Sequence, residues 1–213
     1  MIVIEMFVLI LLFFGGVMLI FRASFLHIFH RKKQIFLTFD DGPQPELTEQ
    51  ILKILAQESV KATFFCVGDC AQRCPELVTR IKQEGHSVGN HTMHHLNGWH
   101  TSLKDYIADV GQADKILKTN LFRPPYGKIG LRQWWYLRKK YRIVFWTAIS
   151  YDWNQRFSPE KCLSKVKSVA KYGGIVVFHD NPKAAQNMLQ TLPVFIRLAK
   201  KHNAQFKVFD EKK

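Results

Sequence analysis

The stretch FLTFDDGPQP, residues 36–45, places two adjacent aspartates at the end of an apolar run. Aromatic and β-branched residues followed by Gly-Pro are typical of a buried strand that ends in a tight turn. Adjacent carboxylates repel each other, and the repulsion grows as the surroundings exclude water. Asp40 and Asp41 therefore either cap the turn or lie beside a positively charged group.

Outside this stretch, short apolar runs alternate with longer segments of helical period. The runs expected to form strands are 35–39, 62–67, 86–90, 143–148, 174–179 and 206–209. The segments expected to form helices are 45–57, 75–84, 102–119, 131–140, 159–171 and 184–201. Several strands are apolar almost throughout, as strands covered on both faces are. The alternation predicts an α/β fold with parallel strands, in an open sheet or a barrel.

Composition is consistent with one compact domain over residues 35–213. The chain has 213 residues, of which 47% are hydrophobic and 23% charged, and no internal repeat or later domain boundary is visible. Neither a G-x-G-x-x-G nor a Walker A sequence occurs, which argues against a nucleotide-binding fold. The net charge of +14 favours anionic partners such as lipid headgroups. The basic clusters carry no nucleic-acid-binding motif, so we expect no nucleic-acid partner; solvated helix faces are the alternative to a membrane surface.

The N-terminus differs from the rest of the chain. Residues 6–21 contain no charged residue, and residues 2–4 extend the apolar stretch to a length that can cross a bilayer. A cleaved signal peptide is the alternative, but the basic residues follow the apolar run instead of preceding it. We predict a single-pass transmembrane anchor over residues 1–22 and a basic juxtamembrane linker over 23–34. Positive charge on the C-terminal flank predicts a membrane-attached domain that faces the cytoplasm.

The segment NHTMHHL, residues 90–96, supplies three histidines close together. Residues four apart share a helical face, so His91 and His95 can bind one ion, with Asp41 as a third ligand. A histidine-rich loop is more often a polar surface turn, but the neighbouring aspartates favour a site. Two imidazoles, one carboxylate and an open position describe a catalytic divalent metal site. One aspartate would bind the ion while the other accepts a proton from water.

Three further polar residues follow later expected strands. Arg123, before the di-proline turn of FRPPYG (122–127), either belongs to a surface turn or holds a carboxylate in a bidentate fork. Asp152 lies in SYDWN (150–154), and His179 lies in VVFHD (176–180). A histidine at a strand end is usually only hydrogen-bonded. Here it could protonate a leaving amine, with Asp152 raising its pKa.

Five segments occur in a recognisable order: TFDDGP, NHTMHH, RPPY, WTAISYDW and IVVFHD. They resemble the five ordered motifs of the NodB-homology polysaccharide deacetylases, which are metal-dependent carbohydrate esterases. The resemblance covers residues 35 to about 209. It implies a distorted (β/α) barrel with fewer than eight units and one divalent metal ion, commonly Zn²⁺.

The resemblance also implies a role for each matching residue. Asp40 would be the catalytic base, oriented by Arg123, and His179 would be the general acid, assisted by Asp152. The metal ligands would be Asp41, His91 and His95, where the motif register selects His95 over His94. The backbone N–H of Tyr126 would stabilise the oxyanion, and Pro125 and Trp153 would belong to the substrate pocket. Two positions depart from the family pattern, since Leu96 replaces a common proline and Ile149 replaces an earlier acid.

The expected function is removal of N-acetyl groups from N-acetylhexosamine residues of a glycan, such as peptidoglycan or a chitin-like oligosaccharide. The alternative is deacylation of a lipid-linked, undecaprenyl-type amino sugar at the membrane face, which the apolar N-terminus and the basic charge favour. A third hypothesis is an inactive, membrane-tethered carbohydrate-binding protein, whose mark would be a missing base or metal ligand. The sequence indicates neither the sugar nor the oligomeric state.

Overall fold

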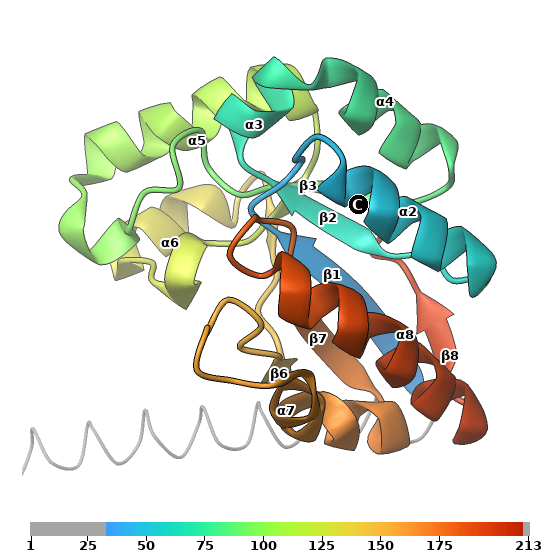
Figure 1. Ribbon diagram of the computed structural model, residues 1–213. Coiled ribbons are helices and arrows are strands. Elements are labelled where there is room, and N and C mark those ends of the chain that lie inside the picture. Colours follow the sequence, from blue (N-terminus) through green and yellow to red (C-terminus); the bar gives the residue numbers. More distant parts are fainter. Residues whose placement is uncertain (1–32, 211–213) are drawn as a thin grey trace, which may run out of the picture.

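A curled sheet of eight parallel strands forms the centre of the molecule, which we describe from a computed structural model over residues 33–210 (Figure 1). Seven strands follow the order β5-β4-β3-β2-β1-β7-β6, and β8 pairs with the beginning of β1. Their bounds are β1 Gln34–Asp40, β2 Thr63–Cys66, β3 Ser87–Asn90, β4 Leu121–Phe122, β5 Arg142–Ile143, β6 Ala148–Ile149, β7 Gly174–His179 and β8 Gln205–Lys207. This curled half-barrel confirms the α/β prediction and the expected likeness to a distorted (β/α) barrel.

The helices lie largely where the periodicity predicts them. They are α2 Leu47–Gln57, α3 Gly68–Arg73, α4 Pro75–Gln83, α5 Leu103–Leu117, α6 Leu131–Leu137, α7 Pro159–Tyr172 and α8 Ala185–Lys201, with short 3₁₀ turns η1 Gly98–His100 and η2 Pro125–Gly127. Pro75 and Pro159 occupy first turns, where a missing N–H costs little. The sequence missed α3, whose six residues are too few for a helical period to show.

The two faces of the sheet bury different side chains, and β1 shows the division most clearly. Ile35, Leu37 and Phe39 pack in the main core, which also contains side chains of α2, α7 and α8. The alternate residues Phe36, Thr38 and Asp40 lie on the inner face of the curl. The inner face therefore carries polar groups toward the carboxyl end of β1.

The expected strand over 143–148 is wrong as a single element. Of its six residues, only Ile143 belongs to β5, which pairs with β4, and only Ala148 belongs to β6, which pairs with β7. Within residues 33–210, β5 and β6 are the two ends of the strand order, so the sheet is open between them. The intervening carbonyls of Val144 and Phe145 accept hydrogen bonds from the side chain of Arg123 instead of from a neighbouring strand.

No helix within residues 33–210 is long and apolar enough to cross a membrane. The predicted anchor over 1–22 and nearly all of the predicted linker over 23–34 lie outside the described residues.

Candidate active site

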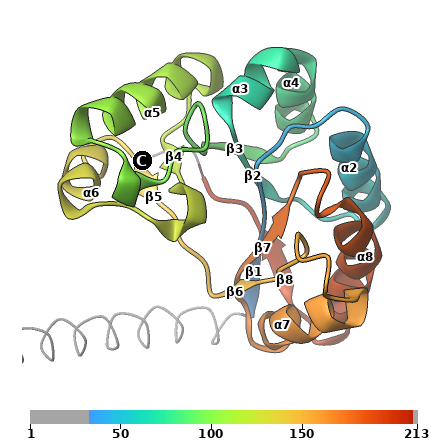
Figure 2. The ribbon, with the colours of Figure 1, turned by 60° about the vertical axis from the view of Figure 1, so that its left-hand side comes forward.

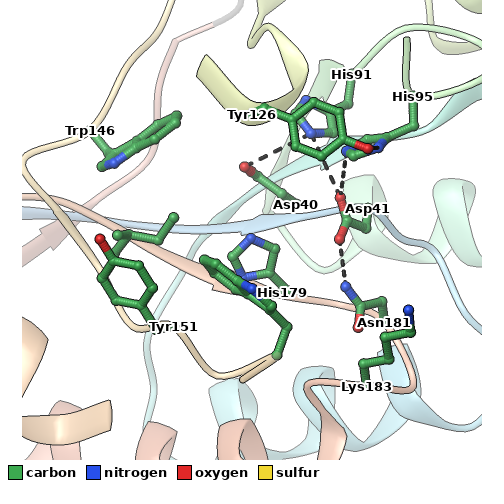
Figure 3. Close-up of a pocket in the computed structure, with 12 residues that line it drawn as sticks. Asp40, Asp41, His91, His95, Tyr126, Trp146, Tyr151, His179, Asn181 and Lys183 are labelled. Atoms are coloured by element: carbon green, nitrogen blue, oxygen red, sulfur yellow. Dashed lines mark hydrogen bonds and ion pairs between the residues drawn. The ribbon is translucent and has the colours of Figure 1, made fainter. Parts of the chain in front are cut away.

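A cavity of about 430 Å³ opens where the strands β1 and β7 end (Figure 3). Carboxyl ends of parallel strands are where α/β-barrel enzymes carry their reactive groups. Six of the residues selected from the sequence line this cavity: Asp40, Asp41, His91, His95, Trp153 and His179. Tyr126, whose backbone N–H is predicted to stabilise the oxyanion, lines the cavity as well.

The adjacent aspartates reach the same cavity from different backbone conformations. Asp40 is the last residue of β1 and points to the inner face, where its side chain is buried. Asp41 would point away in a continuing strand, but its φ of 80° ends the strand and turns its carboxylate back. The next residue must be glycine, since a Cβ on Gly42 would lie 2.1 Å from Oδ2 of Asp180. The two carboxylates are therefore held in different surroundings.

Asp41, His91 and His95 form a possible metal site. Their ligand atoms all lie within 4.8 Å of one another. Oδ1 of Asp41 is 3.2 Å from Nε2 of His95 and 3.7 Å from Nε2 of His91. Nδ1 of His91 donates to the carbonyl of Arg123 at 2.7 Å, which leaves Nε2 as the ligand atom. The nitrogen and oxygen donors suit a divalent ion such as Zn²⁺, so the donor set fits the implied cofactor.

The local structure that brings the two histidines together is a loop. We expected a shared helical face, which is wrong because residues 91–97 contain no helix. Thr92 and His95 instead adopt φ angles of 68° and 56°. The carboxylate of Asp109, on α5, holds the loop by accepting from the amides of Met93 and His94.

His94 does not join the site. Its Nδ1 pairs with Oδ1 of Asp109 at 2.5 Å, and its side chain is 57% exposed. The structure thus brings His95, and not His94, to Asp41, as the motif register predicts.

Charges and burial keep these groups in the forms that bind metal. Burial lowers the pKa of His91 to about 4, so its imidazole is neutral at pH 7. For Asp41, burial raises the pKa, but a hydrogen bond from His95 and the positive charge of His179 outweigh it. The pKa of Asp41 therefore lies below its usual range, and the carboxylate is ionised.

Arg123 lies behind Asp40 and is completely buried. Its Nη1 donates to Oδ1 of Asp40 and to Oγ1 of Thr38, both at 2.7 Å. The expected bidentate fork is wrong, because the remaining nitrogens donate to the carbonyls of Val144 and Phe145, at 3.2 and 3.4 Å. One guanidinium thus orients the carboxylate and also satisfies the backbone at the open edge of the sheet.

His179 lines the cavity with Asp40 and Asp41, and Asp152 supports it. Oδ1 of Asp152 is 2.8 Å from Nδ1 of His179, and Oδ2 accepts from the backbone N–H of the same histidine at 2.9 Å. Burial alone would lower the pKa of His179, but Asp152 outweighs burial and raises it to about 9. The imidazole is therefore protonated at neutral pH. Trp153 packs edge-on against it, with 4.4 Å between ring centroids.

Three selected residues lie behind the cavity. Arg123 and Asp152 are fully buried and reach it only through Asp40 and His179. Pro125, in η2, is also buried; we expected it in the substrate pocket, but it does not line the cavity. Its neighbour Tyr126, with a φ of 59° and 60% of its surface exposed, lines it instead.

Sequence reasoning did not assign five other residues that line the cavity, namely Trp146, Ile149, Tyr151, Asn181 and Lys183. The first three lie inside the WTAISYDW segment, which the sequence already indicates as part of the site. Asn181 and Lys183 lie one and three residues after VVFHD. Asn181 matters most, because its Nδ2 donates to Oδ2 of Asp41 at 2.5 Å (Figure 3). No spacing in the sequence indicates that contact.

The fold is a parallel α/β half-barrel. Its site combines a possible metal site, a buried carboxylate and a histidine paired with a carboxylate. This combination defines the class of protein, a hydrolytic enzyme of the barrel type. The family model described as polysaccharide deacetylase matches residues 29–143, and the chain belongs to this family. The resemblance seen in the five motifs is thereby confirmed, and with it the carbohydrate esterase class.

Named relatives share most of the chain. A peptidoglycan-N-acetylglucosamine deacetylase of Bacillus cereus is 33% identical over 190 residues, which is 85% of this chain and 89% of the relative. A chitooligosaccharide deacetylase of Azorhizobium caulinodans is 30% identical over 173 residues, covering 72% of this chain and 76% of the relative. The crystal structure of the Bc1960 peptidoglycan N-acetylglucosamine deacetylase superposes with a TM-score of 0.81 at 30% identity, covering 86% and 92% of the two chains.

Proposed function

We propose that the chain hydrolyses N-acetyl groups on N-acetylhexosamine residues of a glycan, with the help of one divalent metal ion. The observation that carries the proposal is the arrangement inside one cavity. A buried carboxylate, a possible metal site and a protonated histidine all line it. Amide hydrolysis needs a base, a group that polarises the carbonyl and an acid for the leaving amine.

Asp41, His91 and His95 would hold the ion, and Zn²⁺ suits their donor atoms. When bound, the ion supplies Lewis-acid polarisation of the amide carbonyl and lowers the pKa of a water molecule. Asp40 accepts the proton of the attacking water, since it faces the cavity and Arg123 holds its carboxylate at one oxygen. The backbone N–H of Tyr126 is the proposed oxyanion donor.

His179 then donates a proton to the leaving nitrogen. Asp152 holds its Nδ1, so Nε2 is the atom that gives up the proton. Trp153 and its neighbours provide apolar surface in which the acetyl methyl group can be buried, and the acetyl group leaves as acetate.

The named substrates of the relatives support a glycan as the substrate. Those relatives act on peptidoglycan and on chitooligosaccharides. For this chain we propose the same class, a peptidoglycan or chitin-like oligosaccharide carrying N-acetylglucosamine units.

A lipid-linked amino sugar is the second candidate, and Lys183 favours it. Among the residues that line this cavity, Lys183 is the one lysine or arginine, so it can meet a phosphate on the substrate. From the apolar N-terminal segment and the basic residues after it, we also propose that the chain is anchored in a membrane, with its domain on the cytoplasmic side. A domain so placed would meet lipid-linked precursors.

The test incubates the Zn²⁺-loaded full chain with an N-acetylated chitooligosaccharide, a peptidoglycan fragment and an undecaprenyl-diphosphate-linked N-acetyl sugar. Mass spectrometry of the sugars, together with released acetate, measures deacetylation. We expect turnover of at least one substrate and none with His179→Ala. Lys183→Ala should raise KM for the diphosphate-linked sugar and leave the neutral oligosaccharide unaffected.

If no substrate loses its acetyl group while the parent and Asp40→Asn bind the oligosaccharide equally well, the enzymatic proposal is wrong. The chain would then be a carbohydrate-binding protein. Lys171→Ala, on the exposed surface of α7, is the matched control for Lys183→Ala.

A further inference from the structure

One long segment of the chain is strongly basic and contains no acid. Between Asp114 and Asp152 there is no aspartate or glutamate, whereas nine lysines and arginines occur. They are Lys115, Lys118, Arg123, Lys128, Arg132, Arg138, Lys139, Lys140 and Arg142. Arg123 belongs to the active site, but most of the others lie on or near α6. This charge is therefore concentrated on one part of the surface.

Helix α6 presents a mixed apolar and basic face to solvent. Gln133 and Leu137 form its buried side. Leu131, 73% exposed, and Trp135, 54% exposed, lie one turn apart on the opposite side. Large apolar side chains with this exposure usually mark an interaction site when they are grouped.

The side chain of Gln133 joins the 3₁₀ turn η1 to α6, because its Nε2 donates to the carbonyls of Gly98 and Thr101. This places Trp99, which is 65% exposed, beside the beginning of α6, and its Nε1 donates to the carbonyl of Ile129. We name the α6 surface as the set Trp99, Lys128, Leu131, Arg132, Trp135 and Arg138. Figures 1 and 2 show α6 at one edge of the molecule, away from α8.

Cations in this surface lie directly against its aromatic rings. Nζ of Lys128 is 5.2 Å from the ring centroid of Trp99. Cζ of Arg138 is 4.7 Å from the centroid of Trp134 and 4.6 Å from that of Trp135. Indole rings with adjacent cationic groups match the boundary between acyl chains and headgroups, where amphipathic side chains keep their charge in water.

We propose that the α6 surface docks on an anionic lipid bilayer. Leu131 and Trp135 would enter the interface, and Lys128, Arg132 and Arg138 would meet anionic headgroups. A platform that stacks sugars fits less well, because the Arg138 guanidinium already lies over the rings of both Trp134 and Trp135. Such a platform also needs hydrogen-bond acceptors, and this segment offers no carboxylate.

Docking would bring the cavity close to the bilayer. Tyr126 lines the cavity, and Lys128 of the α6 surface follows it by two residues. The inference goes beyond the proposed function and does not need it, since lipid contact can be measured without a substrate.

The five tryptophans make the full chain its own reporter. They are Trp99, Trp134, Trp135, Trp146 and Trp153, so none lies in the first 32 residues. Quenching of their fluorescence by brominated acyl chains reports contact of the domain with lipid, whatever the N-terminal segment does. The full chain is mixed with vesicles of brominated phosphatidylcholine, with and without phosphatidylglycerol. We expect quenching that needs phosphatidylglycerol and falls as salt is added.

Two variants test the surface and keep all five reporters. Arg132→Glu with Arg138→Glu should reduce the ratio of docked to undocked domain by about tenfold or more. Leu131→Ser should also reduce the ratio of docked to undocked domain, because it removes apolar contact with the bilayer and leaves the charge unchanged. Lys167→Glu with Lys171→Glu is the matched control, a double reversal of exposed charges on α7 that should leave quenching unchanged. Near-ultraviolet circular dichroism checks that each variant keeps its fold.

The proposal is overturned if the parent is not quenched in anionic vesicles, or if the control pair loses as much quenching as the α6 pair. It is also overturned if a chitooligosaccharide shifts the fluorescence of the parent but not that of Trp135→Ser, while brominated lipid quenches neither. The α6 surface would then bind glycan.

Discussion

Asp40 and Asp41 are neighbours in sequence that occupy different surroundings. Asp40 accepts from the Arg123 guanidinium, whereas Asp41 lies against two imidazoles and the amide of Asn181. A carboxylate held by a buried guanidinium and one held beside the imidazoles of the proposed metal site are suited to different tasks. The proposed division of roles between base and ligand therefore has a structural basis in one backbone torsion, the φ of 80° at Asp41.

Asp41→Ala should lower Zn²⁺ affinity by about 100-fold or more, because it removes the one carboxylate among the three proposed metal ligands. Asp40→Asn should keep the affinity within a few-fold and lower turnover by about 10² to 10⁴, the usual contribution of a positioned base. Chelator competition measures the affinity, and acetate release measures the turnover.

Asp69→Asn is the matched control for these variants, since Asp69 forms an exposed ion pair with Arg73 on α3. It should change neither quantity. Equal loss of metal in the Asp40 and Asp41 variants would show that the two carboxylates bind the ion together.

Asn181 makes a contact with Asp41 that only the folded chain reveals, and we expect it to act as a positioning residue. Its amide donates to Asp41, and its Oδ1 accepts from the backbone of Ala184 at the start of α8. Asn181→Ala should weaken Zn²⁺ affinity by about 10-fold to 100-fold, as loss of a group that orients a ligand does. Chelator competition measures the loss.

Thermal unfolding of the metal-free Asn181→Ala protein is the control, because loss of the contact with Ala184 acts on stability alone. Asn154→Ala provides a second comparison outside the cavity. Unchanged metal affinity in Asn181→Ala would mean that Asp41 needs no such partner.

At the scale of elements, the open edge of the sheet depends on Arg123. Strands β5 and β6 do not pair, and the carbonyls between them bond to this guanidinium, which also bonds to β1. A charge with no exposed surface is tolerated only when it is paired and hydrogen-bonded. The same side chain therefore stabilises the fold and orients the proposed base.

Arg123→Met should lower the free energy of unfolding by about 3 to 5 kcal/mol, since it leaves Asp40 buried without its partner. Urea unfolding of the metal-free protein measures this. Arg123→Met combined with Asp40→Asn should recover part of the loss, because the unpaired charge is then absent.

Arg156→Met, at an exposed arginine, is the control and should change stability by less than about 0.5 kcal/mol. A small loss for Arg123→Met, with no difference between the single and double variants, would show that Arg123 does not stabilise the open edge.

At the scale of the whole molecule, His86 makes stability depend on pH. Its Nδ1 accepts from the amide of Ala62, so the imidazole is buried in its neutral form. Burial lowers its pKa to about 4, from an ordinary value near 6.5. Between those values the unfolded chain binds more protons than the folded one, so stability falls as pH decreases from about 6.5 to about 4.

His86→Asn should remove this loss, since an amide oxygen can accept from Ala62 and does not titrate. We expect the parent to lose about 2 kcal/mol more than the variant across this range, measured by urea unfolding with a chelator present. His100→Asn, at an exposed histidine, should follow the parent. Parallel pH curves for the parent and His86→Asn would contradict the assignment.

The sequence was most informative where a motif or a period is local. The aromatic and β-branched run before Asp40 predicts β1, and Pro75 and Pro159 mark true helix starts. It was least informative for elements of two or three residues. Strand β4 and the separation of β5 from β6 show no local pattern, because they depend on pairing with distant strands.

The sequence by itself determined the α/β alternation, the family and the residue types that the chemistry needs, because these are local or carried by ordered motifs. Only the tertiary structure decided how these residues meet: the loop that brings His95 to Asp41, the single contact between Arg123 and Asp40, and the amide of Asn181. The physical reason is that these contacts depend on positive φ angles at Asp41 and His95 and on an open sheet edge that a buried arginine fills. Such features arise from packing between distant segments, which residue spacing does not encode.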